Sequence, residues 1–185
     1  MKRLLFFCFF LMLVTHTQAQ EEETEKGLVA WGLDAQRYPA GFIFQAKADW
    51  AVGKKGLLMA KGGYNLARRQ DFGKKDKEEG GGFGFSGALR EYFKPGRTGF
   101  YSELQISTWF LDIDWEDNIP VRRGSTDITV IQPTIGIGYD LLLPPNVKLS
   151  MIIAFGYELN VITSGEPVGE GGISLVGLSA SFLLR

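Results

Sequence analysis

The chain has 185 residues, a mass of 20.5 kDa and a formal net charge of −1, which fits one folded domain. Its 45% hydrophobic and 22% charged residues exclude a disordered or highly charged tail protein, and nothing in it is basic enough to suggest nucleic acid as a partner. Cys8 and His16 are its only cysteine and histidine. Beyond residue 16 the chain therefore lacks the thiol and imidazole that Ser-His or Cys-His catalysis and ordinary zinc sites require.

The first residues have the pattern of a secretory signal. Lys2 and Arg3 precede an apolar run over 4–14, and Thr17 and Ala19 supply the small residues of a cleavage site. The run is too short for a membrane-spanning helix. We therefore predict a signal peptide over 1–19, a polar leader over 20–26 and one folded unit over 27–185.

Alternation of apolar with polar or small residues dominates the rest of the chain. In 147–161 the odd positions are apolar and the even positions mostly polar or small. This period of two is typical of a β-strand with one apolar face. The same pattern predicts eight strands, at about 28–36, 42–51, 56–68, 82–93, 100–111, 131–141, 147–161 and 174–184.

The segments between the strands alternate in kind. Tight-turn residues stand at 54–56, 95–97 and 144–146, whereas longer polar stretches, predicted as loops, cover 70–81, 114–125 and 162–171. The short first connection, 37–40, falls at the loop end by count. This order predicts an eight-stranded antiparallel up-and-down barrel with both chain ends at the turn end.

The alternation leaves open which face points outward. Small residues on the polar faces suit a narrow lumen, strand lengths suit a bilayer, and aromatics near strand ends suit interfacial girdles, so we predict a transmembrane barrel. The alternative is a secreted, soluble, lipocalin-like barrel that binds an apolar ligand, with Phe42, Trp50, Ile153 and Phe155 as its cavity wall. The aromatics predicted to lie at the membrane interfaces are Trp50, Tyr92, Phe93, Phe100, Trp109, Phe110 and Trp115.

Charged residues on the polar faces would point into that lumen. Because an isolated buried ion is costly, they should pair and form a plug; a selectivity lining or a small polar-ligand site is the alternative. The predicted lumen charges are Asp34, Lys47, Asp49, Lys61, Arg90, Glu103, Lys148 and Glu158.

Two groups of charges fall in the predicted loops. The acidic group Asp112, Asp114, Glu116 and Asp117 lacks the spacing of a calcium loop and a cleft for acid–base catalysis, so it favours a solvated surface. Basic residues that could meet lipopolysaccharide phosphates are Lys74, Lys75, Lys77, Arg122 and Arg123. We predict no catalytic residues, no metal site and no cofactor.

Beyond these patterns, the chain resembles the small outer-membrane β-barrel proteins of the OmpX or OmpA-barrel type, particularly the versions common in Bacteroidetes-like bacteria. The resemblance rests on the eight-strand pattern and on residues 63–65 (GYN), 80–85 (GGGFGF) and 112–115 (DIDW). It implies an integral outer-membrane protein of a Gram-negative envelope with a structural, adhesive or surface-binding role and no enzymatic activity. It also implies delivery by the barrel-assembly machinery, for which Phe182 supplies an aromatic residue near the chain end, and closure of the barrel favours a monomer.

Overall fold

The computed structural model describes residues 27–70 and 74–184, so the predicted signal peptide and leader lie outside the described residues. Eight strands make up the fold: β1 (Leu28–Tyr38), β2 (Gly41–Val52), β3 (Gly56–Gln70), β4 (Lys77–Tyr92), β5 (Gly99–Asn118), β6 (Val121–Leu143), β7 (Val147–Ser164) and β8 (Gly171–Leu183). No helix in the described part of the chain has the length and apolar character needed to cross a membrane.

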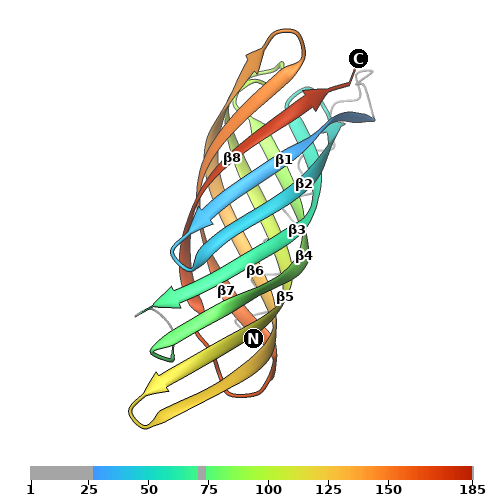
Figure 1. Cartoon of the computed structure of the whole chain (residues 1–185). Coiled ribbons are helices and arrows are strands. Elements are labelled where there is room, and N and C mark those ends of the chain that lie inside the picture. Colours follow the sequence, from blue (N-terminus) through green and yellow to red (C-terminus); the bar gives the residue numbers. More distant parts are fainter. Residues whose placement is uncertain (1–26, 71–73, 185) are drawn as a thin grey trace, which may run out of the picture.

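The strands form one closed antiparallel barrel. Each strand is hydrogen-bonded to the next in sequence, and β8 closes the ring on β1, as Figure 1 shows. Asp34 of β1, for example, lies opposite Gln45 of β2 on one side and Ser179 of β8 on the other. The predicted eight-stranded up-and-down barrel is confirmed.

Burial decides which face points outward. Along β1 and β5, buried and exposed residues alternate over nearly the whole strand. Midway along the barrel axis, the exposed residues are the apolar ones. Phe42, Ile153 and Phe155 are 41%, 53% and 62% exposed. The soluble barrel with these side chains around an inner cavity is therefore wrong, because its cavity wall is the outer surface.

The outward-facing apolar residues form a continuous band. On β5 the band runs from Phe100 to Phe110 and ends where Asp112 follows. At about 3.3 Å per residue and a tilt of about 40°, that segment rises roughly 25 Å along the axis, the height of the apolar band in outer-membrane barrels. The chain is a transmembrane β-barrel, and this architecture places it in the bacterial outer membrane.

Half of the predicted loop 70–81 and most of the predicted loop 114–125 are strand. β4 begins at Lys77, so only 71–76 separate it from β3, and β5 and β6 continue until Ile119 and Pro120 join them. These strand segments look like loops in sequence because, beyond the bilayer, the apolar residues change from the outward face to the inward face. Inward-facing Ile113 and Trp115 are apolar and buried, whereas the alternating outward residues face water and are charged.

The two ends of the barrel differ in outline. We call the end with Leu28 and Leu183 the terminal end and the opposite one the far end. At the far end the β1–β2 hairpin stops early, whereas the β5–β6 hairpin projects well past it (Figure 1). The far rim is therefore slanted, low at β1–β2 and high at β5–β6.

Candidate functional site

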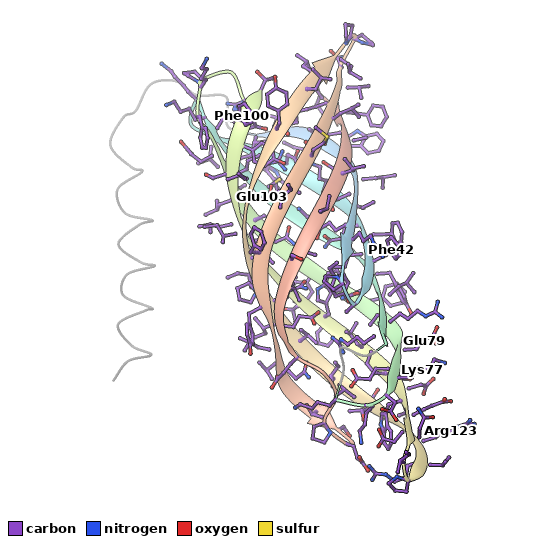
Figure 2. All side chains as sticks on the ribbon, turned by 90° about the vertical axis from the view of Figure 1, so that its left-hand side faces the viewer. Phe42, Lys77, Glu79, Phe100, Glu103 and Arg123 are labelled. Atoms are coloured by element: carbon purple, nitrogen blue, oxygen red, sulfur yellow. The ribbon has the colours of Figure 1, made fainter. Side chains whose placement is uncertain are left out.

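The eight predicted lumen charges all lie inside the barrel, each at most 6% exposed. Figure 2 shows the contrast on β5, where Glu103 points inward and Phe100 outward. The structure does not unite all eight charges. Lys47 and Asp49 form a pair of their own on β2, 3.1 Å apart, and Glu158 lies apart from the others nearer the far end.

Four of the predicted charges form a chain of ion pairs across the lumen. The Lys61 ammonium lies 3.3 Å from Asp34 and 3.2 Å from Glu103. Glu103 in turn accepts hydrogen bonds from Arg90 Nη2 at 2.7 Å and Nε at 2.9 Å. Side chains from β1, β3, β4 and β5 are thereby joined across the interior.

Asp140, which the sequence prediction omitted, extends this chain to Lys148. Its carboxylate lies 3.0 Å from Arg90 Nη1 and 3.4 Å from the Lys148 ammonium, and it also accepts a hydrogen bond from the Tyr92 hydroxyl. Its position on the polar face of β6 was the signal that could have found it.

A second charged group lies nearer the far end. Arg69 bridges Glu78 at 3.1 Å and Glu158 at 2.9 Å, and all three side chains are buried. Sequence reasoning missed Arg69 and Glu78 because both stand beside a polar run. The signal that could have found them is their parity with Lys61 and Arg90 if β3 and β4 are extended.

Glu78 also binds backbone groups of the β3–β4 and β7–β8 connections at the far end of the lumen. Its carboxylate accepts hydrogen bonds from the backbone N–H groups of Lys74 at 2.9 Å, Lys75 at 3.3 Å and Gly169 at 3.0 Å. Val168, next to Gly169, is fully buried in an apolar cluster with lumen residues that include Trp109, Ile113 and Trp115. The β3–β4 and β7–β8 connections thus fold inward over the barrel mouth.

Lys75 joins these connections to the β5–β6 hairpin. Its ammonium lies 3.3 Å from Asp117, forms an ion pair with Glu166 and sits 4.1 Å above the Trp115 ring. Arg122 pairs with the same two carboxylates, at 2.9 Å and 3.2 Å. We call Lys75, Asp117, Arg122 and Glu166 the rim cluster.

The rim cluster favours the ionised forms of Lys75, Asp117 and Glu166. The hydrogen bond between Lys75 and Glu166 raises the pKa of Lys75 and lowers the pKa of Glu166. Desolvation opposes ionisation of Asp117, but hydrogen bonds from Arg122 and Lys75 outweigh it and lower the pKa of Asp117. Lys75 and Arg122 therefore already have carboxylate partners within the protein.

The predicted interfacial aromatics divide into two sets. Phe93, Phe100 and Phe110 are exposed on the outer surface, and Trp50 is half-buried. Tyr92, Trp109 and Trp115 were assigned wrongly, because their side chains are buried inside the barrel. The physical reason is parity: Tyr92 shares the inward face of Arg90, and the two tryptophans share that of Glu103.

The remaining loop charges are mostly paired on the surface. Lys77 lies 3.1 Å from Glu79 and Arg123 lies 3.3 Å from Glu116, near the far end in Figure 2. The acidic group does not converge: Ser125 donates to Asp112, whereas Asp117 belongs to the rim cluster. Among residues 27–70 and 74–184 no group of three or more acidic, cysteine or histidine residues is placed to hold a metal ion.

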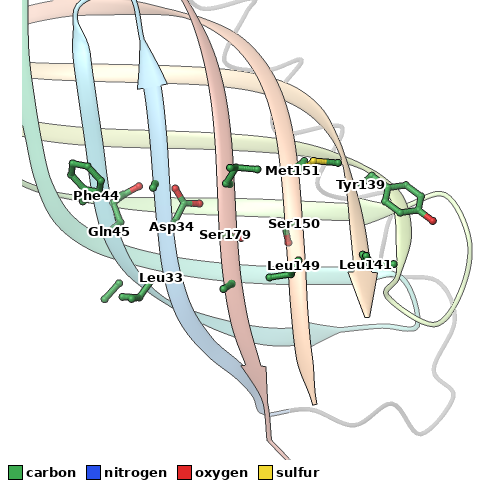
Figure 3. Close-up of a pocket in the computed structure, with 14 residues that line it drawn as sticks. Leu33, Asp34, Phe44, Gln45, Tyr139, Leu141, Leu149, Ser150, Met151 and Ser179 are labelled. Carbon is green, nitrogen blue, oxygen red and sulfur yellow. The ribbon is translucent and has the colours of Figure 1, made fainter. Parts of the chain in front are cut away.

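A pocket lies on the outer wall over β1, β2, β6, β7 and β8 (Figure 3). Ala35, Ala46 and Ala180 are small, and larger apolar side chains such as Phe44 and Met151 stand around them. The polar residues of the same segments, such as Asp34 and Gln45, are buried on the lumen side. The pocket is part of the apolar band and therefore faces lipid.

Comparison with known proteins gives structural neighbours only. No family model matches the chain, and no curated protein matches it in sequence. Neisserial surface protein A has 9% identity and a TM-score of 0.49, covering 84% of this chain and 96% of its own. Ail of Yersinia pestis, solved with the heparin analogue sucrose octasulfate, has 11% identity and a TM-score of 0.47, covering 84% and 97%. The N-terminal β-barrel domain of Pseudomonas aeruginosa OprF has 12% identity and a TM-score of 0.45, covering 83% and 96%.

Proposed function

We propose that the protein is a sealed, non-enzymatic outer-membrane barrel that holds a rigid binding surface outside the cell. In this proposal the terminal end faces the periplasm and the far end faces outward, as is general for barrels of this type. The barrel is the anchor, and the far-end hairpin and its neighbouring connections are the part that meets other molecules.

The lumen contents support the seal. The ion pairs from Asp34 through Arg90 to Lys148 cross the interior, and Trp109, Trp115 and Val168 fill the part nearer the far end. An eight-stranded barrel leaves room for little beyond side chains. Acids and bases that bind one another in this way are also poorly available for catalysis.

One observation supports the role of the far end as a binding surface. The ion pairs of the rim cluster join the β3–β4, β5–β6 and β7–β8 connections to one another. Lys75 comes from the β3–β4 connection, Asp117 and Arg122 from the β5–β6 hairpin, and Glu166 from the β7–β8 connection. The hairpin tip projects from this base with Ile119 and Val121 95% and 78% exposed. A pre-organised projection loses little entropy on binding a partner.

The orientation can be tested on intact cells. Ile119→Cys places a thiol at the exposed tip, and Pro95→Cys places one in a terminal-end turn as the matched control. A membrane-impermeant maleimide should label the first on intact cells and the second only after the envelope is broken. Labelling of Pro95→Cys alone on intact cells would overturn the orientation.

The seal can be tested in planar lipid bilayers. We expect the purified barrel to insert without stepwise conductance, because the paired charges and the apolar cluster leave no water column. Regular conductance steps from the wild-type protein would contradict the seal. A variant that loses two adjacent members of the central ion-pair chain, Arg90→Ala with Glu103→Ala, provides the positive comparison and should conduct more than the wild type.

We also propose that the barrel is a monomer assembled by the barrel-assembly machinery. Closure of β8 on β1 leaves no free strand edge in the membrane region, which favours a monomer. Phe182 is exposed on the outer face near the end of β8 and is placed to serve as the aromatic recognition residue.

A further inference from the structure

The low side of the far rim carries a basic residue on the lipid-facing surface. Arg37 precedes the last residue of β1, next to the β1–β2 hairpin, and its side chain is exposed. Its cross-strand neighbours on the outer face are Phe42 of β2 and Val176 of β8, both exposed and apolar. A cation thus stands at the edge of the apolar band.

Arg37 lies deeper in the membrane than the other outward-facing charges of the far half. The register row that starts at Arg37 passes through Phe42, Leu66 and Gly81 to Asp112. Because the strands are tilted, this row climbs toward the far end as it goes from β1 to β5, and Figure 1 shows the β1–β2 hairpin stopping well short of the β5–β6 hairpin. Asp112 marks the upper edge of the apolar band on β5, so Arg37 lies below that level.

Arg37 also differs from those charges in having no acidic partner. The other outward-facing basic side chains on the far half of the described strands are Arg68, Lys77 and Arg123, and each pairs with Glu79 or Glu116. Among residues 27–70 and 74–184, no carboxylate lies within ion-pair distance of Arg37. Its guanidinium instead lies 4.7 Å from the centre of the Phe42 ring.

This geometry suits an anionic headgroup. Stacking on Phe42 fixes the plane of the Arg37 guanidinium and leaves its N–H edge available, and that edge matches a phosphate with two parallel hydrogen bonds. An arginine at the boundary of the apolar band is tolerated because it can reach the headgroup layer. In the outer leaflet, the anion that the Arg37 side chain can reach from there is a lipid phosphate.

We propose that Arg37 binds the phosphate of a phosphorylated glycolipid of the lipid A class, seated beside the low β1–β2 rim. The proposal rests on the proposed function, since it requires the far end to face outward. It moves the predicted lipopolysaccharide contact away from Lys75 and Arg122, which bind carboxylates of the protein itself.

The test uses the full barrel in zwitterionic detergent, titrated with bisphosphorylated lipid A and followed by native mass spectrometry. Arg37→Gln should weaken binding about fivefold, the weight of one basic residue at an anionic lipid surface, and Arg37→Lys should recover part of the loss. Arg123→Gln is the matched control, since Arg123 is also an exposed arginine yet is paired with Glu116, and it should bind as the wild type does.

The proposal is overturned if Arg37→Gln binds as tightly as the wild type, if Arg123→Gln loses as much, or if lipid A without phosphates binds equally well. A heat-dependent gel shift shows that each variant is folded. Failure of the orientation test would instead show that the far end does not face outward, so the two failures are distinguishable.

Discussion

Arg90 is the residue on which the central ion-pair chain depends. Its guanidinium contacts Glu103 at 2.7 Å and Asp140 at 3.0 Å, and all three side chains are almost completely buried. Two carboxylates therefore share one cation inside the barrel. Removing that cation would leave both without their main partner, which is more costly than never having buried the charges.

We expect Arg90→Met to lower the free energy of unfolding by about 3–5 kcal/mol, because Glu103 and Asp140 then lose a buried partner. Arg123→Met, which removes an exposed pair with Glu116, should cost less than about 1 kcal/mol. Urea unfolding of both variants in lipid vesicles measures the difference. Equal costs for the two variants would show that the lumen charges are solvated rather than paired.

Residue parity explains much of what the sequence could and could not predict. Alternation alone assigned Asp34, Lys61, Arg90 and Glu103 inward, because a strand residue's side follows from its count along the strand. Tyr92 and Trp109 were wrongly placed on the outer surface, because their aromatic character was given more weight than their count along the strand. The pairing of Arg90 with Asp140 could not be predicted, since it depends on how the ring of strands closes.

The β5–β6 hairpin shows why an element can be hidden by its own composition. Within the bilayer its outward face is apolar, whereas beyond the bilayer its outward face is charged and its inward face carries Ile113 and Trp115. A charged segment of this kind looks like a loop in sequence, although its strands pair up to Asn118 and Val121. The change of solvent from lipid to water reverses the pattern without ending the strand.

The inward-folded connections depend on Glu78. Glu78→Ala removes the acceptor for the Lys74, Lys75 and Gly169 amides, so exchange of these amides with solvent should rise at least about tenfold. Glu79→Ala changes the neighbouring outward-facing carboxylate and should leave their exchange unchanged. Hydrogen exchange measured by NMR in detergent checks both, and unchanged protection in Glu78→Ala would show that other contacts hold the connections.

The rim cluster should respond to acid. The pKa values of Asp117 and Glu166 are lowered from the ordinary values of 3.8 and 4.5, so the stability that they contribute is complete above those values and is lost as pH falls below them. The NMR signal of the Trp115 indole N–H, beside Lys75, should therefore stay constant from pH 7 to 5 and change with a midpoint below 4.5. Lys75→Met should already give a different signal at pH 7. A midpoint above 5 would contradict the lowered pKa values.

On the scale of the whole molecule, the barrel combines an apolar outer band with a lumen filled by its own side chains and with a slanted far rim. The high side carries the β5–β6 hairpin, which the rim cluster joins to its neighbours by ion pairs, and the low side carries Arg37 near the lipid surface. One closed sheet can do this because strand lengths differ around the ring, from 11 residues in β1 to 23 in β6. Both roles require the barrel to stand in a membrane with its apolar face in lipid.

The most direct test of that claim is gel mobility of the protein from the outer-membrane fraction, compared with and without boiling in SDS. A folded membrane barrel resists SDS and changes its mobility only after heating, so we predict that the protein is found in this fraction and shows such a shift. A soluble protein in the periplasm or medium, with the same mobility before and after boiling, would contradict the assignment of the apolar face to lipid.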